Sequence, residues 1–255
     1  MQFWRFLKWI GILFCFFNLL GVYALPTTWR VVQPGLEYAR LTDFAGFPGG
    51  YIHAFRIDLS KFTFNVVNVP TDEQGGQTIP TLMQREGAII ATNGGFFSPD
   101  FKPLGLRINA GQQSSHLHPT AWWGVFYIQQ DQAKIVARNL YHPEGMPEFA
   151  LQAGPRLLID GKIPQLKPDI DDRTAMGITA DGKVILLATE NVLLSTGQLA
   201  EIMQRSALEG GLDCVNAINL DGGHSTQIYT RLPNLNVQVS SFAPVADVVL
   251  VRSKK

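Results

Sequence analysis

The sequence predicts an α+β fold: mixed, largely antiparallel sheets with a few packed helices, forming a single domain. Short runs of apolar or β-branched residues bounded by turn residues outnumber all other patterns, and such runs are typical of strands. Only two segments show the spacing of an amphipathic helix. No repeat of solenoid period, low-complexity stretch or linker divides the 255-residue chain. The strand runs are Phe62–Val66, Trp122–Ile128, Leu157–Ile159, Val184–Ala188 and Val248–Val251.

The composition excludes two classes of protein. With 46% hydrophobic and 16% charged residues, the chain is too apolar to be a disordered, charge-extended protein. Lys plus Arg equals Asp plus Glu at 21 each, so the formal net charge is zero. No run of Lys or Arg stands out, and we therefore expect no nucleic-acid partner.

The first 24 residues have the composition of a secretory signal peptide. Arg5 and Lys8 precede an apolar stretch over residues 9–23, and small residues stand at the two positions that signal peptidase inspects before cleavage after Ala24. Cleavage there leaves residues 25–255 as the exported domain, periplasmic or secreted, with 19 basic and 21 acidic residues. The alternative is an uncleaved anchor, which would be the only contact with a membrane, because the apolar stretch approaches the roughly 20 residues that span one.

Two Asp-Gly pairs indicate where hairpins turn. Asp160-Gly161 follows the Leu157–Ile159 run, and Asp181-Gly182 separates a strand over Thr174–Thr179 from the Val184–Ala188 run. An Asp-Gly pair between two strand runs is typical of a type I′ turn.

The two helical segments carry start and stop signals. Thr78–Arg85 begins with a capping Thr, has Pro80 in its first turn and ends at Gly87. Ser195–Leu208 begins with a capping Ser, has apolar residues at helical spacing and stops before Gly210-Gly211.

Cysteine provides no disulfide framework. Cys15 lies in the N-terminal apolar stretch and would leave with it, so that Cys214 would be alone in the exported chain. Cys214 opens an apolar run, which favours buried packing over a nucleophilic role.

Polar residues and glycine pairs follow two strands of the buried type. Ala88–Thr92 runs into Asn93-Gly94-Gly95, and Ala217–Leu220 runs into Asp221-Gly222-Gly223-His224-Ser225-Thr226. A glycine pair turns the chain sharply and exposes successive N–H groups to a ligand. Either segment alone is typical of a tight turn, but the repeated pattern predicts that the two turns lie side by side and form one pocket.

Two more charged residues border these segments. Arg173 enters a predicted strand, where its planar fork suits bidentate binding of a phosphate or carboxylate. The alternative is an internal salt bridge to Asp171 or Asp172. Glu190 ends the paired strand and would act with Asp221 as an acid/base or nucleophile pair.

Three other patterns have simpler explanations. His116 and His118 would share one face of a strand and suit zinc, but neighbouring Ser and Pro residues favour a surface loop. Trp122-Trp123 suits sugar stacking, with one ring in the core. Residues 169–172 offer oxygen ligands without EF-hand spacing and are typical of an acidic loop. We therefore expect neither a metal ion nor another cofactor.

Four segments together resemble the phosphodiester glycosidase family. The chain departs from the family at two places. The family usually has a third Gly and then Ser-Ser or Ser-Ala where this chain has His224-Ser225-Thr226, and many members have Asp-Gly where it has Glu190-Asn191. The matching segments, in the family's order, are Asn93-Gly94-Gly95-Phe96-Phe97, Ala153–Leu158 with Asp160-Gly161, Arg173–Gly177 and Asn216–Gly223.

The resemblance implies an exported hydrolase that cleaves a glycosyl-1-phosphodiester, a glycan-phosphate, to free sugar and a phosphomonoester. Arg173 and the N–H groups of the two Gly-Gly turns would hold the phosphate. Asp221 or Glu190 would stabilise a cation-like sugar or activate water, and Asn93 would orient a sugar hydroxyl or a phosphate oxygen. Because both departures border the expected pocket, the alternative is a non-catalytic carbohydrate or cell-envelope glycan-binding module on the same fold.

Overall fold

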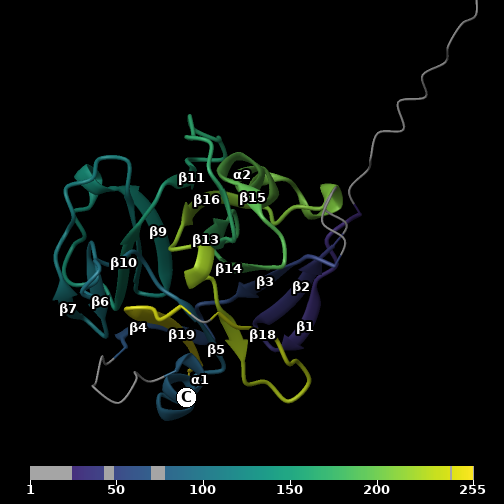
Figure 1. The fold of residues 1–255 in the computed structure, drawn as a ribbon, viewed down its shortest axis with the longest axis horizontal. Coiled ribbons are helices and arrows are strands. Elements are labelled where there is room, and N and C mark those ends of the chain that lie inside the picture. The colour runs from purple at the N-terminus through teal and green to yellow at the C-terminus, as the bar shows by residue number, and fades with distance from the viewer. Residues whose placement is uncertain (1–24, 43–48, 70–77, 242, 255) are drawn as a thin grey trace, which may run out of the picture.

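The computed structural model describes residues 25–42, 49–69, 78–241 and 243–254 (Figure 1). Every strand pairing in these segments is antiparallel, so the largely antiparallel expectation is confirmed and the expectation of mixed sheets is wrong there. The α-helices of the described segments are α1 (Ile79–Arg85) and α2 (Thr196–Gln204). The fold is therefore richer in strands than the predicted α+β class implies.

The largest sheet has seven strands in the order β1-β2-β3-β14-β13-β16-β11. In Figure 1 it extends from β1 and β2 at the right to β11 and β16 near the top, where α2 covers it. Its strands are β1 (Arg30–Gln33), β2 (Leu36–Leu41), β3 (Tyr51–Ile57), β11 (Arg156–Leu158), β13 (Thr174–Thr179), β14 (Val184–Glu190) and β16 (Cys214–Asn219).

Two five-stranded sheets complete the core, in the orders β18-β17-β5-β19-β4 and β7-β6-β10-β8-β9. The first consists of β4 (Phe62–Asn68), β5 (Ile90–Asn93), β17 (Ile228–Thr230), β18 (Gln238–Val239) and β19 (Asp247–Ser253). The second consists of β6 (Arg107–Asn109), β7 (Gln112–Ser115), β8 (Gly124–Gln129), β9 (Gln132–Ala137) and β10 (Phe149–Ala153). A short pair joins β12 (Ile170–Asp171) to β15 (Leu194–Ser195).

The central strands of the seven-stranded sheet are buried on both faces. Along β14, Val184, Leu186 and Ala188 pack into a core shared with the two five-stranded sheets, whereas Ile185 and Leu187 pack into a second core with α2. Because successive side chains of a strand point to opposite faces, a strand covered on both sides has an unbroken apolar sequence. This explains the apolar run that predicted β14.

Both predicted helices exist, but the second is shorter than expected. Thr78 caps α1 as predicted, and Ser195 caps α2 with a reciprocal bond to Gln198. Helix α2 ends at Gln204, because the backbone of Arg205 leaves the helical region with ψ of 150°. The predicted extension to Leu208 is wrong, and the Leu208 side chain is 82% exposed.

The two Asp-Gly turns differ. Asp160 and Gly161 have φ of 48° and 76°, which confirms the type I′ turn. At the second turn only Gly182 has a positive φ, at 81°, and its N–H donates to the carbonyl of Thr179 at 3.0 Å. The type I′ prediction at Asp181-Gly182 is therefore wrong, since that turn needs a positive φ at both residues.

The predicted signal peptide and Cys15 within it lie outside the described residues. Cys214 is a buried free thiol, and burial raises its pKa, which confirms buried packing. Within the segments that the structure describes, no helix is both long and apolar enough to cross a membrane.

Candidate functional site

The two Gly-Gly turns lie side by side, as predicted. Asn93 ends β5, and Asp221 follows β16. The Asn93 amide nitrogen donates to the carbonyl of Asp221 at 2.8 Å, and the Asp221 N–H donates to the carbonyl of Gly94 at 3.2 Å. These two bonds join the ends of strands from two different sheets.

Asn93 is part of the scaffold. Its side-chain oxygen accepts hydrogen bonds from the Thr174 hydroxyl at 2.8 Å and from the Gln227 N–H at 3.1 Å. The residue is 0% exposed. Because its amide is used for internal bonds, the expectation that Asn93 orients a substrate is not met in this structure.

The first glycine pair accommodates a buried ion pair. The carboxylate of Asp247 accepts from the Gly95 N–H at 2.9 Å and from Arg107 Nε at 2.9 Å, and its carbonyl accepts from the Gly94 N–H at 2.9 Å. A Cβ on Gly94 would collide with the Asp247 carboxylate, and one on Gly95 would collide with the Arg107 guanidinium. These N–H groups therefore bind the scaffold, contrary to the expectation that they bind phosphate.

The second glycine pair is likewise engaged. The Gly222 N–H donates to the Asp221 carboxylate at 3.1 Å, and the Gly223 N–H donates to the carbonyl of Asp172 at 2.8 Å. Gly223 has φ of +58°, a conformation that favours glycine. The turn fixes the direction of the Asp221 carboxylate and brings the Asp171–Asp172 segment against it.

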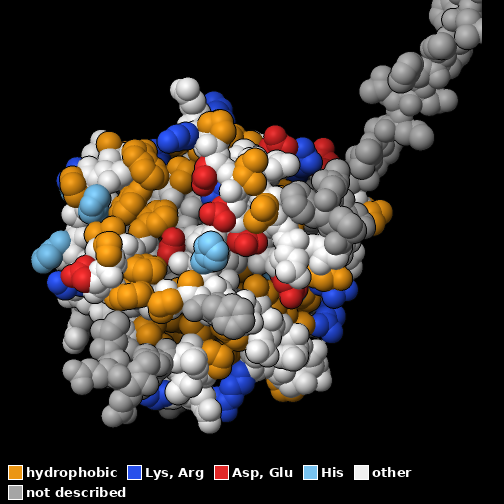
Figure 2. Space-filling view, viewed as in Figure 1, with side chains coloured by type: hydrophobic (Ala, Val, Ile, Leu, Met, Phe, Trp, Pro, Cys, Tyr) orange, Lys and Arg blue, Asp and Glu red, His pale blue; other side chains and the backbone are white. Residues whose placement is uncertain are grey.

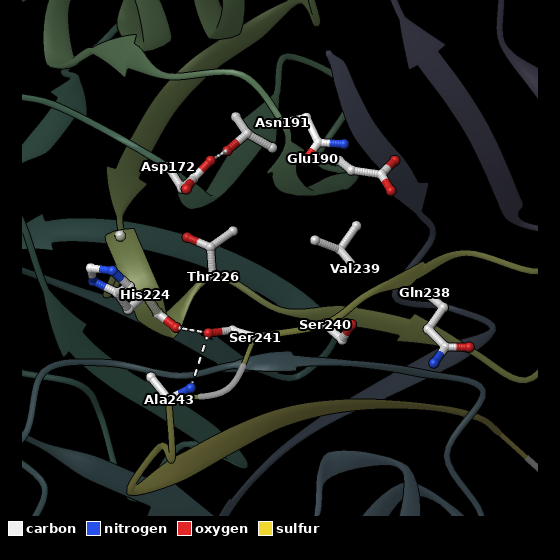
Figure 3. Close-up of a pocket in the computed structure, with 12 residues that line it drawn as sticks. Asp172, Glu190, Asn191, His224, Thr226, Gln238, Val239, Ser240, Ser241 and Ala243 are labelled. Carbon is white, nitrogen blue, oxygen red and sulfur yellow. Dashed lines mark hydrogen bonds between the residues drawn. The ribbon is translucent and has the colours of Figure 1, made fainter. Parts of the chain in front are cut away.

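A pocket of about 410 Å³ opens where the ends of β13 and β14 face β18 and the turn after β16. Figure 3 shows Asp172 and Glu190 on one rim and Ser240 and Ser241 on the opposite rim. On the face shown in Figure 2, acidic side chains gather beside a histidine near the middle of the molecule. The pocket is lined by Asp172, Thr189, Glu190, Asn191, Gly223, His224, Thr226, Gln238, Val239, Ser240, Ser241 and Ala243.

Asp172, which lines the pocket, and Asp221, which lies behind its wall and does not line it, both have raised pKa values. Burial is the main cause that raises the pKa of Asp172; the Asp171 carboxylate raises it further, and His224 acts against the rise. Burial also raises the pKa of Asp221, against hydrogen bonds from Ser225 and the Gly222 N–H. Carboxyl groups shifted by burial in a cleft are typical of catalytic sites.

Glu190 is oriented by a hydrogen-bonded chain that the sequence did not reveal. Glu190 Oε2 lies 2.8 Å from His53 Nε2, and His53 Nδ1 lies 2.9 Å from the Tyr38 hydroxyl. A neutral imidazole that accepts from Tyr38 and donates to Glu190 satisfies both bonds. Burial lowers the pKa of His53, against the Glu190 hydrogen bond, which favours this neutral form. No local motif marks His53, since its role depends on the pairing of β3 with β14.

Arg173 belongs to the scaffold in this structure. It is 3% exposed, its Nε donates to the carbonyl of Leu194 at 2.9 Å, and its other nitrogens donate to the carbonyl and carboxylate of Asp169. The guanidinium group that was expected to bind an anion therefore donates its hydrogen bonds to Leu194 and Asp169. Its ion-pair partner is Asp169, and the alternative that named Asp171 or Asp172 as the partner is also wrong.

The three residues after the second glycine pair differ in position. His224 is exposed and lines the pocket, and its carbonyl accepts from Ser241. Ser225 is buried and bonds to Asp221. Thr226 is 4% exposed and lines the pocket, and its hydroxyl has no partner in the described structure. Of the three, His224 and Thr226 are therefore placed to contact a ligand.

The remaining sequence candidates lie away from this pocket. His116 and His118 are in a loop, as favoured, and bond to Gln113 and Thr120. In the Trp pair, the second ring is 6% exposed and the first is 60% exposed, so one ring is in the core as expected. Within the described ranges, no three His, Cys, Asp or Glu side chains gather as metal ligands.

Comparison with known sequences gives a family match over most of the chain. The sequence profile of the phosphodiester glycosidases matches residues 86–252. The uncharacterized protein YigE of Escherichia coli K12 is 31% identical over 113 residues. That alignment covers 40% of this chain and 44% of YigE, so less than half of that relative is matched.

Solved structures share the fold at low sequence identity. The catalytic domain of zebrafish N-acetylglucosamine-1-phosphodiester alpha-N-acetylglucosaminidase, auto-inhibited by its pro-peptide, superposes with a TM-score of 0.64 at 18% identity, covering 90% of this chain and 89% of that one. A hypothetical protein from Synechocystis has a TM-score of 0.58 at 17% identity, covering 91% and 64%. A putative exported protein from Burkholderia pseudomallei has a TM-score of 0.57 at 14% identity, covering 84% and 76%.

Proposed function

Because the chain belongs to the phosphodiester glycosidase family, we propose that it hydrolyses a glycosyl-1-phosphodiester. Water adds to the anomeric carbon, and the bond from that carbon to the phosphate oxygen breaks. The sugar leaves with a new hydroxyl, the phosphate leaves as a monoester, and the water proton is released to solvent.

The observation that carries this proposal is that Glu190 and Asp172 line the same rim of the pocket (Figure 3). The sugar becomes cation-like as the glycosidic bond breaks, and nearby carboxylates stabilise that charge. His53 bonds one oxygen of Glu190 at 2.8 Å, and within the described residues the second oxygen has no hydrogen-bond partner. Glu190 is thus a fixed carboxylate with one oxygen available to a water or to the sugar.

The other carboxyl groups have supporting roles in this proposal. Asp172 lines the pocket, and burial raises the pKa of its carboxyl, which favours a role in proton exchange. Asp221 lies at the start of the glycine turn behind the pocket wall, where its carboxyl group accepts from the Gly222 N–H and orients that turn. A phosphate is a good leaving group, so the reaction places little demand on a general acid.

The test uses a sugar-1-phosphate diester of 4-nitrophenol, prepared with a panel of sugars. Cleavage releases 4-nitrophenyl phosphate, which a coupling phosphatase converts to coloured nitrophenolate. We expect Glu190→Gln to lower kcat by about 100-fold or more, since it keeps the side-chain size but loses the charge. Glu201→Gln, an exposed change on α2, is the matched control and should retain wild-type turnover.

Labelled water identifies the bond that breaks. In ¹⁸O water, attack at the anomeric carbon places the label in the sugar, whereas attack at phosphorus places it in the phosphomonoester. Label in the phosphate would contradict the glycosidase mechanism. Binding of the diesters without turnover of any of them would instead support a glycan-binding module, to which the departures at His224 and Asn191 also point.

A further inference from the structure

We infer that a second hollow, which Glu190 also lines, is an anion-binding subsite; on the proposed function, it takes the phosphate and the group esterified to it. This hollow has a volume of about 570 Å³ and shares Glu190 and Gln238 with the first pocket. Two arginines, Arg30 and Arg40, line it. Both precede residues 86–252, so they lie outside the segment that the family profile matches.

The register of three strand pairs brings these arginines to Glu190. Arg30 lies opposite Tyr38, and Arg40 lies opposite His53. Directly opposed residues of an antiparallel pair project from the same face of the sheet, as do residues two apart on one strand. Both arginines are therefore on the face that carries the Tyr38–His53 chain, and that chain ends on Glu190.

Among the described residues, neither arginine takes part in an ion pair. Arg30 and Arg40 are both exposed. Arg56, on the same sheet, differs from them in having a carboxylate partner. It forms two bonds to the Glu37 carboxylate, at 2.6 and 2.8 Å.

Each guanidinium group lies over an aromatic ring. The guanidinium carbon of Arg40 lies 4.7 Å from the centre of the Tyr51 ring, and that of Arg30 lies 5.9 Å from the Tyr38 ring. Stacking uses the face of a guanidinium and leaves the N–H donors at its edge free. Those donors suit the oxygens of a phosphate, which accept two parallel bonds from one arginine.

The two hollows thus divide by charge in the way that the substrate does. Glu190 lines both hollows, Asp172 lines only the first, and the two arginines line only the second. A glycosyl-1-phosphodiester has a sugar that becomes cation-like and a phosphate that stays anionic. The charges therefore place the sugar in the first pocket, the phosphate in the second and the bond to be cleaved at Glu190.

The test is calorimetric titration of the whole chain with 4-nitrophenyl phosphate, which needs no turnover. We expect Arg30→Gln and Arg40→Gln each to weaken binding about tenfold, the effect of losing a hydrogen bond between charged groups. Arg40→Lys keeps the charge without the planar fork, so its loss should be smaller than that of Arg40→Gln. Lys134→Gln removes an exposed charge from β9, outside the hollow, and should bind like the wild type.

Thermal unfolding shows whether each variant is folded. Because both arginines are exposed, their replacement should leave the melting temperature unchanged. Equal affinity of both Gln variants and the wild type, or no binding by the wild type, would overturn the inference. If the arginines govern binding but no diester is cleaved, the inference stands and the proposed function fails. If diesters are cleaved and the arginine variants bind 4-nitrophenyl phosphate as the wild type does, the proposed function stands and the inferred subsite is wrong.

Discussion

Glu190 is the residue on which the site depends, and its setting follows from its place at the end of β14. Ala188, two residues earlier, is fully buried, whereas the Glu190 side chain is 33% exposed. The strand therefore carries the carboxylate from the core to the rim of the pocket. His53 lies opposite Ala188 on β3 and reaches Glu190 diagonally, which supplies the donor that a half-buried carboxylate needs.

His53 makes the stability of the protein depend on pH. Burial lowers its pKa below the usual 6.5, so the unfolded chain takes up a proton there before the folded protein does. The free energy of unfolding should therefore fall as the pH falls through 6.5. In urea unfolding at a series of pH values, we expect His53→Gln to show a smaller fall than the wild type. His142→Gln, an exposed change, is the control, and an identical fall in His53→Gln and wild type would contradict this account.

At the scale of elements, the buried pair of Arg107 and Asp247 connects three strands. Arg107 lies on β6, Asp247 lies on β19, and both hold the turn that follows β5. Both side chains are 0% exposed. Taking one partner away leaves a buried charge without its counter-charge, which costs far more than breaking a surface pair.

We expect Asp247→Asn to lower the free energy of unfolding by about 3–5 kcal/mol. The amide keeps the shape of the carboxylate but not the charge that faces Arg107. Arg205→Gln is the control, since it breaks the exposed Arg205–Glu201 pair on α2 and should cost about 0.5 kcal/mol or less. Urea unfolding measures both. A loss for Asp247→Asn no larger than the control would show that the ion pair does not hold the turn.

Elements with local signals were predictable, and features that depend on strand register were not. The cap at Thr78, the turn at Asp160-Gly161 and the apolar run of β14 each carry their signal within a few residues. Arg107 and Asp247 are 140 residues apart, and His53 and Glu190 are 137 apart, so only the pairing of strands brings them together.

The predicted end of α2 was wrong for a related reason. Its apolar spacing continues to Leu208, but the chain turns at Arg205 and brings Leu212 into the core. Leu212 is 0% exposed, and its N–H donates to the carbonyl of Ile202. The helix thus ends where the chain turns back to bury Leu212, and helical spacing contains no information on that turn.

At the scale of the whole molecule, we propose from the N-terminal sequence that the chain is exported. We expect the protein made from the full sequence to be recovered outside the cytoplasm with Leu25 as its first residue, because residues 22–24 match a signal-peptidase site. Mass spectrometry of the N-terminal peptide after cell fractionation measures this. A chain lacking residues 2–24 is the control and should stay in the cytoplasm. Recovery of membrane-bound protein that still begins at Met1 would contradict cleavage and favour an uncleaved N-terminal membrane anchor.

The glycine pairs have a consequence for how relatives of this protein are interpreted. The Asn-Gly-Gly and Asp-Gly-Gly segments carry the resemblance, yet their amide groups bind the scaffold, and Gly94 and Gly95 are required by the ion pair behind them. The residues that we assign to chemistry and to phosphate binding, Glu190, His53, Arg30 and Arg40, belong to other strands. On the proposed function, a relative with both motifs but with no carboxylate at the position of Glu190 is expected to keep the architecture and to lack turnover. Sorting active from inactive relatives therefore requires the rim residues of β1, β2, β3 and β14, and the glycine motifs alone are insufficient.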